Sequence, residues 1–334
     1  MLMQPIIDKV SRKFILNELT PERFVRKTNN GNNEIYVITH HDSPYTMMEI
    51  GRLRELTFRY AGGGTGKSLD IDEYDVSSHP YKQLLVWNPE HKEIVGAYRY
   101  IKCREAGYKN GQIDLATTEL FKFSPTFYDK YLDKTIELGR SFVQPSYQPG
   151  EQFRKGLFSL DNLWDGLGAI IVDNPDCSYF FGKVTMYTHY NKEARDMLLA
   201  FMKYYFPDKE KMVKPIHSVK GRRVTAFVKR VVTPNRRSKK VAAFIKSIEG
   251  LPYKDGHLIL NKHVRELGEH IPPLVNAYMN LSPTMKTFGT AINKDFGGVE
   301  ETGIMVCIND IYESKKQRHV DSYKKELESR NHAG

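Results

Sequence analysis

The central sheet of this chain is predicted by residues 81–101, which read YKQLLVWNPEHKEIVGAYRYI. Two apolar runs, 81–87 and 94–101, flank a polar segment that Asn-Pro opens. Apolar runs on either side of a turn signal are typical of an antiparallel β-hairpin. A further apolar run, KTIELGRSFV at 134–143, predicts another strand. We expect these strands to lie in one sheet.

Helical and extended patterns follow one another on both sides of this hairpin. The helix predicted at 43–60 has Ser43 as its N-cap and Pro44 at its first position, a combination typical of helix starts. The sum of the patterns is a mixed α/β (α+β) fold around one sheet. The other predicted helices are 4–19, 154–172, 191–206, 236–249 and 272–281, and the other predicted strands are 34–40, 178–187, 224–232 and 302–310.

The composition is that of an ordinary folded protein, with 334 residues of which 40% are hydrophobic and 27% charged. No apolar run approaches the roughly 18 residues that cross a bilayer. Charges interrupt the apolar residues of the first 20 positions, unlike a secretory signal. Three scattered cysteines, Cys103, Cys177 and Cys307, form no CxxC pair. We therefore expect a cytoplasmic protein.

The net charge of +10 comes almost entirely from one segment, residues 220–240. It holds nine of the 50 lysines and arginines and no Asp or Glu, so the rest of the chain has 41 basic against 40 acidic residues. Such a segment attracts an acidic protein, nucleic acid, or an anionic membrane surface, which would make the protein peripheral on the inner face of the cell membrane. A solvated surface without a partner is the alternative. Nucleic acid is disfavoured, because regularly placed stacking aromatics and a helix-turn-helix are both lacking.

A glycine-rich segment, AGGGTGKS at 61–68, fits the loose form of the phosphate-binding loop. That loop requires a buried strand before it and a helix after it, whose N–H groups hold the phosphates. Here a helical pattern precedes the glycines, and SLDIDEYD (68–75) follows them. We therefore expect a loop without a nucleotide site.

Three stretches carry charged residues where a core pattern would have apolar ones. The first is RELTFR (54–59) followed by DIDEYD (70–75), the second is GAYR (96–99), and the third is ELGRSF (137–142). Each alone has a structural explanation, as a surface residue, a solvated turn or an edge-strand ion pair. Their order along the chain makes them informative.

Taken together, these positions resemble the motifs of the acyl-homoserine-lactone synthases. They resemble more closely those of the N-acyl amino acid synthases and ornithine-lipid-type N-acyltransferases of the GNAT superfamily, often labelled hemolysin-like. The resemblance runs from about residue 34 to 310 and includes LWDGL (163–167) and the segment 271–310. Ala277, where the family has glycine, and the glycine-rich insertion at 61–66 depart from the pattern. The matching positions are Arg54 and Phe58, Asp72 and Asp75, Gly96 and Arg99, and Glu137 and Arg140.

The resemblance implies a GNAT-like acyltransferase fold with N-terminal and C-terminal helical extensions. We expect a helical extension at 1–33, the acyltransferase domain at 34–311 and a polar tail at 312–334. The implied reaction moves a (3-hydroxy) fatty acyl group from an acyl carrier protein thioester to the α-amino group of an amino acid, of the glycine or ornithine type, in aminolipid biosynthesis. No cofactor would be bound permanently, and the donor would be the acyl-phosphopantetheine of the carrier protein, or acyl-CoA.

The resemblance also indicates which charged residues form the site. An α-amino group with a pKa of about 8 must lose a proton before it attacks. Glu137, on a central strand where burial raises the pKa of a carboxyl, would be the base or amine anchor. A splayed strand at 138–139 could supply N–H donors for the oxyanion. Arg140 would organise the strand and substrate, and Asp72 and Asp75, with Arg54 and Arg99 as partners, would hold the amine substrate or an arginine.

Further expectations concern the donor, metals and other functions. Arg154, Lys155 and Gly156 would bind the phosphate of the phosphopantetheine arm. The basic segment would dock the acidic carrier protein or anionic lipid. We expect no metal, because neither the histidines nor the aspartates at 70–75 have the spacing of a metal site. A lactone-signal synthase and a non-catalytic polyanion or nucleic-acid binder are the alternative interpretations.

Overall fold

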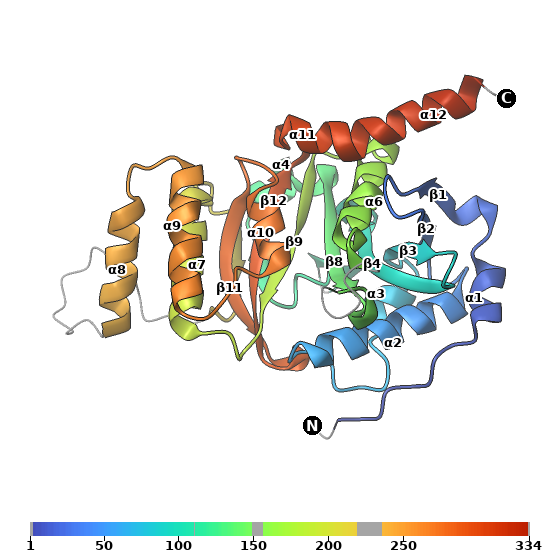
Figure 1. The fold of residues 1–334 in the computed structure, drawn as a ribbon, viewed down its shortest axis with the longest axis horizontal. Coiled ribbons are helices and arrows are strands. Elements are labelled where there is room, and N and C mark those ends of the chain that lie inside the picture. The colour runs from blue at the N-terminus through green and yellow to red at the C-terminus, as the bar shows by residue number, and fades with distance from the viewer. Residues whose placement is uncertain (1–2, 110, 149–155, 219–235, 333–334) are drawn as a thin grey trace.

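The fold is built on a mixed sheet of eight strands (Figure 1). The computed structural model describes residues 3–109, 111–148, 156–218 and 236–332. Neighbouring strands of this sheet are antiparallel, except for β8 and β9, which are parallel. In the order in which they pair, the strands are β1 (Phe24–Lys27), β2 (Glu34–Ile38), β3 (Lys82–Asn88), β4 (Glu93–Lys102), β8 (Thr135–Val143), β9 (Tyr179–Met186), β12 (Val299–Cys307) and β11 (Lys286–Asn293).

Two short antiparallel strand pairs lie outside the main sheet. β5 (Tyr108–Lys109) pairs with β6 (Gln112–Ile113), and β7 (Phe121–Phe123) pairs with β10 (Val213–Pro215). The second pair packs its aromatic and aliphatic side chains against β9 and β11.

The hairpin predicted at 81–101 is confirmed as β3 and β4, with Leu84 opposite Tyr98. The strand predicted at 134–143 is β8, which continues the sheet beside β4. β1 and β11 were not predicted: β1 has four residues, and the register of β11 shifts around Gly289, which interrupts its apolar pattern. The strand predicted at 224–232 lies outside the described residues.

Helices cover both faces of the sheet and its β11 end (Figure 1). α6 and α10 pack on one face and α2 on the other, while α7, α8 and α9 form a group beside β11. α12 lies across α6. The helices are α1 (Arg12–Glu18), α2 (Pro44–Tyr60), α3 (Glu73–Val76), α4 (Pro125–Lys130), α6 (Ser159–Asp173), α7 (Lys192–Tyr205), α8 (Arg236–Ile248), α9 (Tyr253–Glu266), α10 (Pro273–Met279), α11 (Glu313–Lys316) and α12 (Ser322–His332).

The first predicted helix is shorter than expected. Of residues 4–19, the helix occupies Arg12–Glu18, and the residues before it run along the glycine-rich segment. There the Gln4 N–H donates to the Gly66 carbonyl at 2.9 Å, and the Ile7 N–H donates to the Ser68 carbonyl at 3.1 Å. These contacts use backbone groups that a longer helix would have paired within itself.

Alternation along β4 and β8 divides apolar from charged side chains. Tyr98, Ile136 and Leu138 pack in the hydrophobic cluster beneath α6 and α10. On β4, Arg99 follows Tyr98, and on β8, Glu137 stands between Ile136 and Leu138. Because successive side chains of a strand point to opposite faces, Arg99 and Glu137 face the other side of the sheet. The mixed α/β class predicted from the sequence is confirmed by this arrangement.

β8 and β9 separate after a short parallel ladder. Their pairing runs from Thr135 opposite Tyr179 to Leu138 opposite Gly182 and ends there. A Cβ atom on Gly182 would lie 2.6 Å from the Leu138 carbonyl oxygen, so glycine permits the close approach at this point. On its other edge β8 shifts register against β4, and Arg140 adopts a positive φ of 47°. The bulge turns β8 away from β9.

Candidate active site

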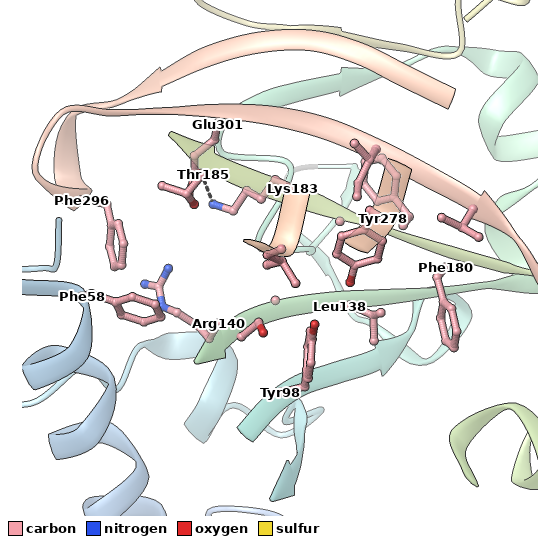
Figure 2. Close-up of a pocket in the computed structure, with 17 residues that line it drawn as sticks. Phe58, Tyr98, Leu138, Arg140, Phe180, Lys183, Thr185, Tyr278, Phe296 and Glu301 are labelled. Atoms are coloured by element: carbon pink, nitrogen blue, oxygen red, sulfur yellow. Dashed lines mark hydrogen bonds and ion pairs between the residues drawn. The ribbon is translucent and has the colours of Figure 1, made fainter. Parts of the chain in front are cut away.

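A cavity opens between β8 and β9 where their pairing ends (Figure 2). Its volume is about 60 Å³. Most of its lining is aromatic or aliphatic, and the charged side chains in it are Arg140, Lys183 and Glu301. The full lining is Phe58, Tyr98, Leu138, Gly139, Arg140, Ser141, Phe180, Phe181, Gly182, Lys183, Thr185, Leu274, Tyr278, Phe296, Glu301, Ile304 and Val306.

Arg140 is held at the edge of this cavity from two sides. Its Nε lies 2.9 Å from Asp70 Oδ2, and its Nη2 lies 3.6 Å from Asp72 Oδ2. Its guanidinium stacks on the Phe296 ring with 4.5 Å to the ring centroid. Positive φ costs a residue with a side chain about 1–3 kcal/mol, so the surrounding contacts must hold this backbone in place. The predicted organising residue therefore borders the cavity with a fixed side chain.

The two aspartates of the Asp–x2–Asp motif form the capping box of α3. Asp72 accepts a hydrogen bond from the Tyr74 N–H at 3.1 Å, and Asp75 accepts one from the Asp72 N–H at 3.2 Å. Arg99 Nη1 lies 2.7 Å from both carboxylate oxygens of Asp72. Burial alone would raise the pKa of Asp72, but the charges of Arg99 and Arg140 outweigh it and hold that pKa well below its usual range.

Arg54 lies at the centre of a fully buried network behind this motif. Its Nη1 donates to Asp75 Oδ2 at 2.9 Å and its Nη2 to Gln83 Oε1 at 2.5 Å. Gln83 closes the ring by donating to Asp75 Oδ1 at 3.0 Å. The side chains of Arg54 and Asp75 are 0% exposed and are not part of the cavity's described lining. The structure thus brings Arg54, Arg99, Arg140, Asp72 and Asp75 together, with Arg140 nearest the cavity.

Glu137 is buried on the charged face of β8, close to this group. Tyr81 donates to its Oε1 at 3.0 Å, and Thr117 donates to its Oε2 at 2.7 Å. Burial raises the pKa of this carboxyl, in the direction expected from the sequence. Glu137 is not part of the cavity's described lining, because Leu138 and the residues after it form the β8 side of the cavity.

Sequence reasoning missed an ion pair inside the cavity. Lys183 on β9 and Glu301 on β12 lie 2.5 Å apart, measured from Nζ to Oε2. Lys183 interrupts the mostly apolar strand sequence SYFFGKVTMY (178–187), and Glu301 lies in VEETGIMV (299–306). A charged residue within each strand was the sequence signal that could have indicated this pair. Asp70, the third partner of the motif, was also missed, although it stands in the same DIDEYD run.

Two tyrosines complete the cavity beside β8. Tyr98 and Tyr278 direct their hydroxyl groups toward each other from β4 and α10 (Figure 2). Burial raises the pKa of both hydroxyls, so both are neutral phenols at neutral pH.

The predicted donor-binding residues are described only in part. Arg154 and Lys155 lie outside the described residues. Gly156 lies against the chain at Tyr147, and a Cβ atom on it would overlap the Tyr147 carbonyl oxygen. Of the basic segment at 220–240, the side chains of Lys239 and Lys240 are described; both residues are exposed, and Lys240 Nζ lies 2.8 Å from Glu193 Oε1.

The glycine-rich loop at 61–66 holds a carboxylate of its own chain. Glu55 accepts hydrogen bonds from the Thr65 N–H at 3.0 Å, the Thr65 hydroxyl at 2.8 Å and the Gly66 N–H at 2.8 Å. The loop follows the C-terminus of α2. It therefore lacks the strand before it that a phosphate-binding loop requires, and Glu55 occupies N–H groups that an anion would use.

The described residues contain no cluster suited to a metal ion and no helix suited to crossing a membrane. No group of three or more His, Cys, Asp or Glu in them is placed to hold a metal ion. No helix in the same residues combines the length and the apolar composition that crossing a membrane requires.

Comparison with known proteins gives a family match and two close relatives. The family model described as an acetyltransferase (GNAT) domain matches residues 53–155. A glycine N(alpha)-acyltransferase of Phocaeicola vulgatus is 49% identical over 97% of this chain and 95% of its own length. A glycine N(alpha)-acyltransferase of Bacteroides thetaiotaomicron is 50% identical over 96% of this chain and 91% of its own. No solved structure matches.

Proposed function

The chain belongs to the family of these glycine N(alpha)-acyltransferases, and from that premise we propose that it acylates glycine from an acyl carrier protein. It is a GNAT-like acyltransferase that acts on the amino group of an amino acid. The proposed reaction moves a 3-hydroxy fatty acyl group from a phosphopantetheine thioester to the α-amine, as a step of aminolipid biosynthesis.

The observation that carries this proposal is the cavity at the separation of β8 and β9. The cavity is small, about 60 Å³, and glycine is the smallest amino acid. Cationic Arg140 and Lys183 and anionic Glu301 line it, so both charges of a free amino acid have a counterpart.

The chemistry requires a neutral amine, a polarised carbonyl and a leaving thiolate. The amine loses one proton and attacks the thioester carbon, the carbonyl oxygen becomes an oxyanion, and the carbon–sulfur bond then breaks. We assign the oxyanion donors to N–H groups of β8 beyond Leu138, where the strand has left β9. The thiolate takes up the second amine proton as it leaves, so no protein nucleophile is needed.

Other charged residues near the cavity hold the backbone of β8 in position. Arg140 fixes the bulge of β8 through Asp70 and Asp72. The prediction that Glu137 is the base or amine anchor stays a prediction. Its two oxygens accept hydrogen bonds from Tyr81 and Thr117, which fix the position of its carboxylate.

The test is acyl transfer by the purified full chain. We expect 3-hydroxyacyl carrier protein and glycine to give N-acylglycine, measured by mass spectrometry, and an equal amount of free thiol. Thiol release without N-acylglycine would contradict amine transfer. Faster reaction with ornithine would overturn the proposed acceptor, and equal or faster reaction with acyl-CoA would overturn the proposed donor.

A further inference from the structure

We propose that the ion pair of Lys183 and Glu301 recognises the amino-acid substrate. In this assignment Lys183 binds the α-carboxylate and Glu301 binds the amine and accepts its proton. The inference rests on the proposed function and deepens it by naming the residues that select the acceptor.

The pair borders the cavity from the strands opposite β8. Lys183 and Glu301 project into it from β9 and β12, and Arg140 faces the same space from β8 (Figure 2). The side chains of Lys183 and Glu301 are 11% and 3% exposed. Charges this far from water interact strongly with any ion that enters the cavity, because water screens them little.

Glu301 is positioned by neighbours other than Lys183. Asn293 Nδ2 donates to its Oε2 at 3.2 Å, and the Thr185 hydroxyl donates to its Oε1 at 3.4 Å. These contacts keep the carboxylate in place if Lys183 changes partner. Arg140, in contrast, is fixed by Asp70 and by the Phe296 ring. Lys183 carries a point charge on a flexible four-carbon stem, so it is the cation that is suited to exchange its partner Glu301 for a substrate carboxylate.

The two charges match the two ends of a small amino acid. Without substrate, Lys183 neutralises Glu301 across 2.5 Å. A substrate carboxylate that binds Lys183 leaves Glu301 free to accept hydrogen bonds from the substrate ammonium. Glu301 then takes one proton from the ammonium, the nitrogen–carbon bond forms, the carbon–sulfur bond breaks, and the second proton leaves with the thiolate. By binding Lys183, the carboxylate of the substrate thus frees Glu301 to act as the base for the amine of the same substrate molecule.

The experiment compares glycine with glycinamide, which has the amine but no carboxylate. We expect the wild type to prefer glycine. Lys183→Met should raise KM for glycine roughly ten- to a hundredfold and leave KM for glycinamide nearly unchanged, because it removes a charge-assisted contact to the carboxylate. Glu301→Gln should lower kcat for both acceptors. A matched control is Lys286→Met: Lys286 lies on β11 outside the cavity, and its Nζ is 2.9 Å from Glu210 Oε1.

The outcomes separate this inference from the proposed function. A wild type that forms no N-acylglycine would overturn the proposed function. An active wild type whose preference for glycine survives in Lys183→Met would overturn the inference alone. A single variant that leaves a buried charge unpaired can fail to fold. The double variant Lys183→Met/Glu301→Gln carries no unpaired charge and should fold without the preference for glycine.

Discussion

Two groups of oppositely charged, paired side chains in this molecule lie in different surroundings. Arg54, Asp75 and Gln83 form a closed ring in which the arginine and aspartate side chains are 0% exposed. Lys183 and Glu301 also pair with each other, but they border a cavity. A closed network fixes the positions of the elements that it joins, whereas charges beside open space can bind a ligand. Burial within a closed network therefore marks architecture, and burial beside a cavity marks chemistry.

The largest effect should come from opening the closed ring. Arg54→Met removes the nearer of the two cations beside the buried Asp75 and leaves Arg99 Nη1 at 3.4 Å, so the free energy of unfolding should fall by about 3 kcal/mol in urea titrations. Lys262→Met is the control, because its pair with Glu266 is exposed and 4.0 Å long, and it should change stability by less than about 0.5 kcal/mol. Equal stability of the two variants would show that the ring is not architectural.

A change at the cavity edge should lower activity as well as stability, because Arg140 is also the cation beside the buried carboxylate of Asp70. Arg140→Met removes the cation between Asp70 and the cavity, and we expect kcat/KM to fall roughly ten- to a hundredfold. Steady-state kinetics on the proposed reaction, with circular dichroism to confirm folding, gives the answer. Full activity in this variant would place the reaction elsewhere.

The ion pairs of Asp72 with Arg99 and Arg140 should be sensitive to acid. Because the pKa of Asp72 is lower folded than unfolded, its stabilisation is present above the unfolded pKa of about 4 and is lost as pH falls toward the folded value. Asp72→Asn keeps a cap acceptor for α3 but should cost about 2 kcal/mol at pH 7 and progressively less toward pH 3. Unfolding curves at both pH values test this. A constant difference between wild type and variant would contradict it.

The smallest effect should come from the glycine-rich loop. Glu55→Gln weakens the hydrogen bonds from Thr65 and Gly66, and we expect a loss of about 1 kcal/mol. Differential scanning fluorimetry measures the shift, and adding ATP with Mg²⁺ should give no further stabilisation in either protein. Stabilisation of the wild type by the nucleotide would restore the phosphate-binding interpretation.

The sequence revealed the closed group more readily than the open one. The hairpin at 81–101 stands out by its two apolar runs around an Asn-Pro turn. Arg54, Asp72, Asp75 and Arg99 stand out because each lies a fixed short spacing from its partner in a motif. Lys183 and Glu301 have no such spacing, since they meet only when β9 pairs with β12. The positive φ of Arg140 is likewise set by the sheet around it, and no local pattern predicts it.

The short parallel ladder of β8 and β9 divides the main sheet into two halves. In the described part of the sheet, the half ending in β8 and the half beginning with β9 share four residue pairs. Every other junction of the main sheet joins strands within one half, but the side chains of β8 and β9 pack in the same hydrophobic cluster. The two halves are therefore held together by their common core more than by backbone hydrogen bonds, and beyond Leu138 and Gly182 the pairing of β8 with β9 has ended.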